Sequence, residues 1–156
     1  MIIDLEPPEG VPPVRLGMTR DEARAPLATW GDVSPFRRTP DGELGWQVLG
    51  PAVQGFVYVD TSGRVNAIEF ARPRTKDVDI RYRDTSIFSE AALDVLARLE
   101  ERGIRIEASD PYFPEAPDLY LGFSRDSGEE VSPVDGLSLH FESVLVAAPG
   151  YGSGTG

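Results

Sequence analysis

The 156-residue sequence contains no cysteine and only one histidine. The lack of cysteine excludes a disulfide framework, a thiolate-bound zinc ion and a cysteine nucleophile. A single histidine, His140, cannot supply a two-histidine metal site or a pair of histidines acting as acid and base. A proton-transfer role for His140, on the outward side of a predicted strand beside Glu142, stays open, but a half-exposed strand residue is the favoured interpretation.

Long apolar segments are missing too. No segment approaches the roughly 20 apolar residues of a membrane-spanning helix, and the first residues lack the basic start and apolar run of a secretory signal. We therefore expect a cytoplasmic protein. The 26 Asp and Glu residues outnumber the 15 Lys and Arg residues, for a formal net charge of −11. This charge argues against binding to nucleic acids or to anionic membranes.

Motifs for catalysis and for cofactor binding are also absent. There is no G-x-S-x-G motif, and Ser62 and Ser127 are interpreted as turn residues. The glycine-rich tail 150–156 is not followed by a helix, so it is no dinucleotide-binding loop. Residues 126–130 offer oxygen atoms that could bind a cation, but they lack the D-x-D-x-D-G order of a calcium-binding loop. We expect no catalytic residue, no metal and no cofactor, and a non-enzyme is favoured.

What the sequence does contain is an alternation of helix and strand signals. Thr19 and Glu22 form a capping box that predicts a short helix, with Pro26 inside it and its end before Gly31. Leucines at helical spacing predict a second helix over residues 89–102, ended by a glycine. Strands are expected at residues 2–5, 44–49, 56–59, 65–70, 104–108, 118–124 and 137–147.

This pattern predicts a single α+β domain over residues 1–149, with two main helices packed on one face of an antiparallel sheet. The order of helix and strands occurs twice, which suggests a tandem pseudo-repeat over residues 14–73 and 84–149. A single sheet whose elements merely alternate is the other possibility. Residues 150–156 have nothing to pack against, and we expect them to form a flexible tail.

Two segments resemble known families. Residues 14–24 (VRLGMTRDEAR) resemble the LGMT-x-x-E-V start of the first helix in small α+β modules, which include the outer-membrane-assembly lipoproteins and the two-repeat β-lactamase inhibitor proteins. Residues 146–151 resemble the end of uncharacterised actinobacterial proteins of similar length. This chain lacks the lipidation cysteine and offers one helix in each half, where those modules usually have two. The resemblance implies helices on one face of an antiparallel sheet and a role in binding a partner.

The acidic excess belongs to one half of the chain. Residues 1–83 hold 12 acidic and 11 basic residues, whereas residues 84–156 hold 14 acidic and 4 basic residues. The second half also contains residues 110–123, where aromatic residues, prolines and acids are combined, as is typical of protein-binding surfaces. The predicted partner-binding residues are Glu107, Asp110, Tyr112, Phe113, Glu115, Asp118, Glu129 and Glu130.

Some residues of this acidic half allow two interpretations. Tyr112 and Phe113 are either binding anchors or parts of a turn, whereas Tyr120 and Phe123 are interpreted as core residues of a strand. A basic stretch over residues 72–83 suits phosphate or carboxylate, but aspartates alternate with its cations. A solvated loop with compensated charges is therefore the favoured interpretation of that stretch.

The favoured function is a non-enzymatic protein-binding domain whose acidic half engages a basic partner, in the manner of an immunity or inhibitor protein. The alternative is a small-molecule-binding or weakly catalytic domain with a pocket between its helices and its sheet. The sequence does not indicate an oligomeric state.

Overall fold

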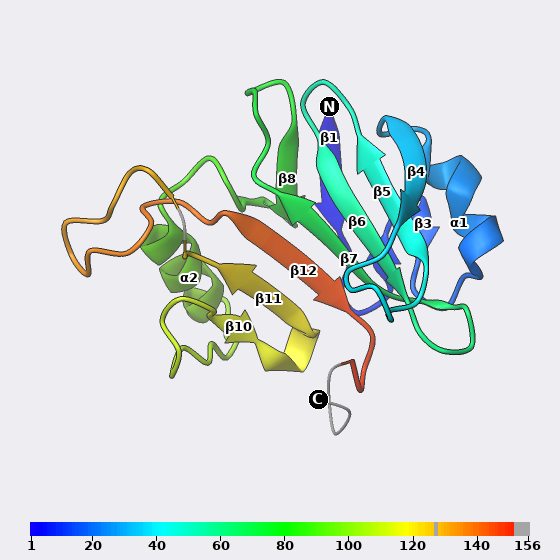
Figure 1. Ribbon diagram of the computed structural model, residues 1–156. Coiled ribbons are helices and arrows are strands. Elements are labelled where there is room, and N and C mark those ends of the chain that lie inside the picture. The colour runs from blue at the N-terminus through cyan, green and yellow to red at the C-terminus, as the bar shows by residue number, and fades with distance from the viewer. Residues whose placement is uncertain (127, 152–156) are drawn as a thin grey trace.

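The computed structural model describes residues 1–126 and 128–151, and its centre is a seven-stranded antiparallel sheet (Figure 1). Across this sheet the strands are, in order, β10 (Glu115–Ala116), β11 (Leu121–Ser124), β12 (Ser143–Ala147), β7 (Val65–Ala71), β6 (Gln54–Val59), β5 (Gly45–Leu49) and β4 (Asp32–Phe36). The two smaller sheets are formed by β1 (Ile2–Leu5), β8 (Asp79–Tyr82) and β9 (Thr85–Ser86), and by β2 (Gly10–Val11) and β3 (Val14–Arg15). The helices are α1 (Arg20–Leu27), α2 (Ala92–Glu101) and the short 3-10 helix η1 (Pro117–Leu119).

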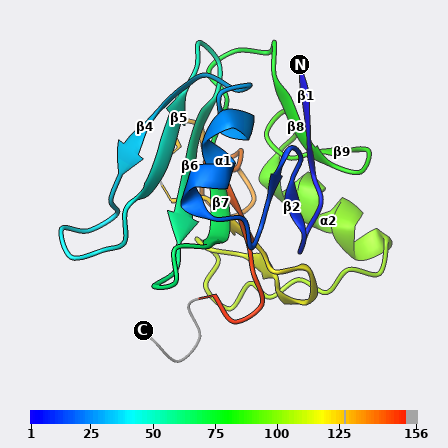
Figure 2. The ribbon, with the colours of Figure 1, turned by 90° about the vertical axis from the view of Figure 1, so that its right-hand side faces the viewer.

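Both α-helices and the β1–β8–β9 sheet lie on one side of the seven-stranded sheet (Figure 2). Side chains that point to this side, such as Val57, Ile68 and Phe70, are buried in the core. On the other side no helix or strand of the described residues covers the sheet, and we call this side the open face. The predicted α+β fold, with the helices packed against the sheet, is confirmed.

Helix α1 begins at the predicted capping box. The Glu22 backbone N–H donates to the Thr19 hydroxyl at 3.2 Å, and the Thr19 backbone N–H donates to the Glu22 carboxylate at 2.9 Å. Pro26 lies in the last turn of this eight-residue helix, which ends at Leu27. The short helix ending before Gly31 is therefore confirmed, since local capping and proline chemistry determine both of its ends.

Helix α2 begins at Ala92, later than the residues 89–102 predicted from its sequence. Ala91 has an extended backbone, and the Ala92 backbone N–H donates to the Leu139 carbonyl at 2.7 Å, a bond to a distant loop that the sequence does not reveal. Gly103, the glycine predicted to end this helix, has a left-handed φ of +82°. The buried residues of the helix are Ala92, Val95, Leu96 and Leu99.

Three predicted strands are wrong in whole or in part. Residues 104–108 form no strand, and Glu107 makes only an isolated bridge with Glu115. The strand predicted at 118–124 is limited to β11, and the one predicted at 137–147 is limited to β12. Ser138, in the part of this range that is not strand, is 4% exposed, and its carbonyl accepts two hydrogen bonds from the buried Arg125.

The basic stretch 72–83 is not only the solvated loop that was predicted. Residues 79–82 form β8, which pairs in parallel with β1, so that Ile80 lies opposite Ile3. Five further strands, β2, β3, β4, β9 and β10, were not predicted from the sequence. The short strand predicted at residues 2–5 is confirmed as β1, although it belongs to a separate sheet.

The seven-stranded sheet is built from two consecutive meanders. Strands β4 to β7 follow α1, and β10 to β12 follow α2. The last strand of each meander lies at the centre, where β7 and β12 pair antiparallel with Phe70 opposite Val144. This order suits a helix-plus-strands pattern in each half, and the tandem pseudo-repeat itself stays a prediction. Ser127 and residues 152–156 of the predicted tail lie outside the described residues.

Candidate functional site

The open face is built from rows of side chains that cross the strands, because successive residues of a strand point to opposite faces. One row crosses the whole sheet, and each of its members lies opposite the next. It consists of Ser34, Gln47, Phe56, Glu69, Leu145, Gly122 and Glu115. The row ends at Glu115, which is one of the predicted partner-binding residues.

Phe36, Phe56 and Tyr58 form an aromatic cluster on the open face, and all three rings are half-buried. The Phe36 ring centroid lies 4.8 Å from that of Phe56 and 6.5 Å from that of Tyr58. Strand β5 separates Phe36 from Tyr58, and Gly45 of β5 pairs with Phe36 and lies against the backbone of Tyr58. A Cβ atom at position 45 would collide with the Val57 carbonyl oxygen, so this close approach of β5 to β6 requires glycine.

Polar groups fix the Tyr58 ring in place. Its hydroxyl donates to the Glu69 carboxylate at 2.7 Å, and the Arg38 guanidinium lies 5.1 Å from its ring centroid. Arg38 also donates to the Tyr151 hydroxyl at 3.1 Å. Burial raises the pKa of Tyr58, and the hydrogen bond and charge of Glu69 raise it further. Tyr58 is therefore held as a neutral hydrogen-bond donor at physiological pH.

A groove extends from Arg38 and Glu69, the two residues that contact Tyr58, to the predicted partner-binding segment. The groove has a volume of about 230 Å³, and Arg38, Glu69, Phe113, Glu115 and Leu145 are among the residues that line it. Phe113 is 53% exposed, as a binding anchor has to be, and so belongs to the open face rather than to the core. Its neighbour Tyr112 is 46% exposed.

Three of the predicted acidic residues gather at the β10 edge of the sheet. The Arg105 guanidinium contacts the Glu107 carboxylate at 2.8 Å and the Asp118 carboxylate at 3.2 Å. Glu107 also exchanges two backbone hydrogen bonds with Glu115, of 2.8 and 2.9 Å. We call Glu107, Glu115 and Asp118 the acidic edge. Asp110 has a local role, because its carboxylate accepts a hydrogen bond from the Tyr112 backbone N–H at 3.1 Å.

The remaining predicted residues, Glu129 and Glu130, lie elsewhere. They line a cleft beside the connection between β7 and β8, together with Arg72 and Arg74. The structure therefore divides the eight predicted residues between the neighbourhood of β10 and this second cleft.

The interpretation of Tyr120 as a core residue is wrong. Tyr120 is 40% exposed and has a left-handed φ of +55°, because it ends η1 and turns the chain into β11. Phe123 is buried as predicted and stacks on Phe141 with a centroid distance of 4.6 Å. His140, predicted on a strand, lies in the loop before β12, and its Nδ1 is buried without a hydrogen-bond partner among the described residues.

The aromatic cluster itself was missed in the sequence, although a signal for it exists. In the predicted hairpin, Phe56 and Tyr58 alternate with Val57 and Val59, so both faces of that strand carry large apolar side chains. A strand with one face in water normally has polar residues on that face. Aromatic residues at the outward positions therefore indicate a surface with a use of its own.

No family model, no curated protein and no solved structure matches the chain. In the described ranges, no helix is long and apolar enough to cross a membrane, and no group of three or more histidine or acidic side chains is placed to hold a metal ion. The fold and the site thus define an α+β domain with an aromatic, uncovered sheet face and an acidic edge.

Proposed function

We propose that this chain is a non-enzymatic protein-binding domain that docks a basic partner on its open face and its acidic edge, as an immunity or inhibitor protein would. The observation that carries the proposal is the groove that extends from Arg38 and Glu69, which contact Tyr58 of the aromatic cluster, to the exposed Phe113. Aromatic anchors of this kind provide most of the affinity at many protein interfaces.

The aromatic cluster supports docking because its rings are already held in place. Phe36, Phe56 and Tyr58 pack against one another, and Glu69 and Arg38 constrain Tyr58. A partner that binds such rings loses less side-chain entropy than one that orders a flexible surface. A sheet face with no covering layer also provides the flat area that a protein partner needs.

Charge determines which kind of partner is favoured. Glu107, Glu115 and Asp118 border the groove end of the open face, and Arg105 is the cation that contacts two of them. The half of the chain that provides this edge holds 14 acidic and 4 basic residues. A basic partner would be steered to this surface and would find its charges complemented there.

A pull-down from the native cell extract tests the proposal. The immobilised protein is expected to capture a basic protein at low salt, with weaker capture at high salt. Phe113→Ala should abolish capture, whereas Val134→Ala, at a 79% exposed position outside the groove, should leave it unchanged. Equal capture by the two variants, or no basic protein at low salt, would overturn the proposal.

The second candidate function, small-molecule binding, is favoured by one observation. A cavity of about 740 Å³, within the size range of ligand sites, lies beside the β7–β8 connection. Its lining residues are not among those of the open-face groove, so binding there would not compete with a docked protein.

A further inference from the structure

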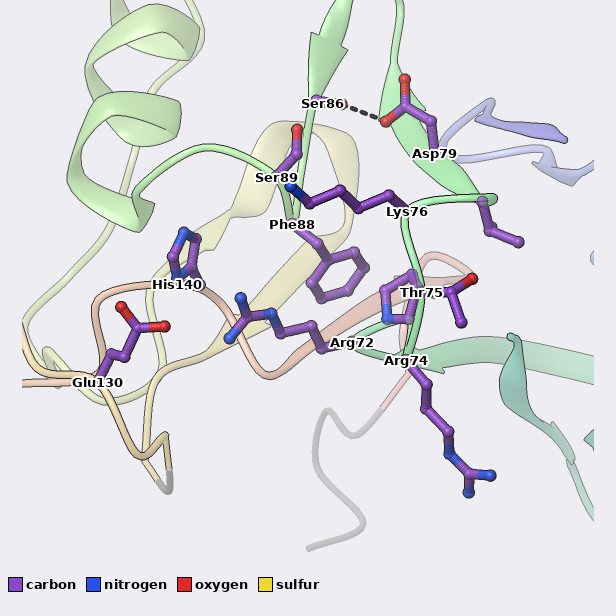
Figure 3. Close-up of a pocket in the computed structure, with 12 residues that line it drawn as sticks. Arg72, Arg74, Thr75, Lys76, Asp79, Ser86, Phe88, Ser89, Glu130 and His140 are labelled. Atoms are coloured by element: carbon purple, nitrogen blue, oxygen red, sulfur yellow. Dashed lines mark hydrogen bonds between the residues drawn. The ribbon is translucent and has the colours of Figure 1, made fainter. Parts of the chain in front are cut away.

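The cavity beside the β7–β8 connection brings together three segments of the chain (Figure 3). Arg72 and Lys76 come from the connection itself, Phe88 and Ser89 precede α2, and His140 precedes β12. Figure 3 shows Lys76 extending past the Phe88 ring toward Ser89 and Arg72 extending toward His140, whereas the guanidinium of Arg74 is directed away.

The cations of this cavity lack close carboxylate partners. Across residues 1–126 and 128–151, Lys76 and Arg74 form no ion pair within 4.0 Å, and Arg72 contacts only Glu142, at 3.9 Å. Other arginines of the chain have much closer partners, as in the 2.6 Å contact between Arg98 and Glu90. A ligand would therefore not have to break a close ion pair to contact Arg72 or Lys76.

Two acidic residues, Asp79 and Glu130, also line the cavity. Asp79 accepts a hydrogen bond from the Ser86 hydroxyl across the β8–β9 pair, so its carboxylate is already engaged. Glu130 also lines the cavity and forms no ion pair within the described residues. Because the guanidinium of Arg74 is directed away, Arg72 and Lys76 are the cations that face the cavity, and a bound anion would take its charge-assisted hydrogen bonds from these two.

His140 and Ser89 add uncharged donors to the cations. The Nδ1 atom of His140 is buried and has no partner in the described part of the chain. His140 and Ser89 both line the cavity, so the imidazole ring and the hydroxyl are within reach of a ligand there.

We propose that this cavity binds the phosphate group of a small molecule. A phosphate has several acceptor oxygens and takes charge-assisted hydrogen bonds from arginine and lysine. Arg72, Lys76, Ser89 and His140 provide such donors from three directions, and Phe88 provides an apolar surface for the rest of the ligand. The proposal is independent of protein docking, because the two sites share no lining residue.

The single histidine makes the test direct, because the imidazole proton signals in an NMR spectrum belong to His140 alone. Inorganic phosphate, added at constant pH and ionic strength, is expected to shift these signals until they saturate. Acetate in the same titration serves as the control anion and should leave them unchanged. A shift that does not saturate, or an equal shift with acetate, would overturn the proposal.

Two variants distinguish phosphate binding in this cavity from a general effect of the protein's positive charges. Lys76→Gln and Arg74→Gln each remove one positive charge from an exposed residue of the same connection, but only Lys76 points into the cavity. Phosphate affinity should fall about tenfold in Lys76→Gln, the loss expected for one hydrogen bond to a charged group, and hardly at all in Arg74→Gln. Equal losses of phosphate affinity in both variants would show that phosphate does not bind in the cavity.

Phenyl phosphate distinguishes the two possible sources of the phosphate group. Tighter binding of phenyl phosphate than of inorganic phosphate would identify a phosphate ester as the ligand, with its organic part on Phe88. Equal affinity for the two probes would identify free phosphate. Binding of neither probe at millimolar concentration would overturn the proposal.

Discussion

The guanidinium of Arg125 lies 2.7 Å from the carboxylate of Asp135, although the arginine side chain is only 2% exposed. Arg125 also donates two hydrogen bonds to the Ser138 carbonyl, of 3.0 and 2.8 Å. This contact fastens the end of β11 to the loop that leads to β12. A buried charge is tolerated only with such partners, so the pair determines the path of that loop.

Replacing Asp135 should destabilise the fold. Asp135→Asn leaves the buried guanidinium without a counter-charge, and we expect the free energy of unfolding to fall by about 2 kcal/mol, below the full cost of breaking a buried pair because Asp135 is 30% exposed. Urea denaturation measures the change. Asp126→Asn, which removes the same charge from an exposed neighbour without an ion pair in the described residues, should change it little.

The same pair predicts a pH dependence. The hydrogen bond from the Arg125 guanidinium holds the pKa of Asp135 below its usual value. A lowered pKa in the folded state gives stability that is present above the unfolded pKa of about 4 and is lost as the pH falls below it. The stability difference between the wild type and Asp135→Asn should therefore shrink between neutral pH and about pH 3. A difference that stays constant over this range would contradict the assignment.

Two phenylalanines on adjacent strands test the assignment of the sheet faces. Phe70 is fully buried and packs edge-on against Trp30 at 5.2 Å, whereas Phe56 is half-buried on the open face. Phe70→Ala should cost about 4 kcal/mol of unfolding free energy, and Phe56→Ala about 1 kcal/mol. Thermal and urea unfolding measure both. Comparable losses would mean that another part of the chain covers the open face.

Tyr58 predicts a loss of stability at alkaline pH. Burial and the neighbouring Glu69 raise the pKa of its hydroxyl in the folded state. For a raised pKa, the stabilisation is complete below the unfolded pKa of about 10 and is lost as the pH rises beyond it. Wild-type protein should therefore lose stability above about pH 10 more steeply than Tyr58→Phe, which has no hydroxyl to ionise. Parallel pH profiles of the two proteins would contradict this account.

The capping box of α1 gives a local prediction. Thr19→Ala removes the side-chain acceptor of the Glu22 backbone N–H and should lower the free energy of unfolding by about 1 kcal/mol. Thr61→Ala, in the exposed turn between β6 and β7, is the matched control and should have little effect. Urea denaturation of both variants decides whether the cap contributes as its geometry indicates.

The sequence predicted those features that depend on neighbouring residues. The start of α1 at Thr19, its short length around Pro26 and the β6–β7 hairpin all follow from local chemistry, and the structure contains each of them. The outward-facing pair Phe56 and Tyr58 was in the predicted hairpin as well, but its function as part of a surface depends on Phe36 of another strand.

The features that were missed depend on distant contacts. Strand β4 contains Pro35, which normally argues against a strand, but β4 is the edge of the sheet, where a missing backbone donor is tolerated. The pairing of β8 with β1 joins residues nearly eighty positions apart, with Arg81 opposite Asp4. The burial of Arg125 requires Asp135 and Ser138, and no local pattern indicates it.

The central pairing of β7 with β12 makes the two halves of the chain dependent on each other. A single cut in the exposed β7–β8 connection, near Thr75, would leave one fragment with β7 as a bare edge and the other with β12. Each fragment would offer the hydrogen-bonding row that the other lacks, and β1 and β8 would join them a second time. Two fragments that form the complete sheet only when they are brought together are the components that a split reporter requires.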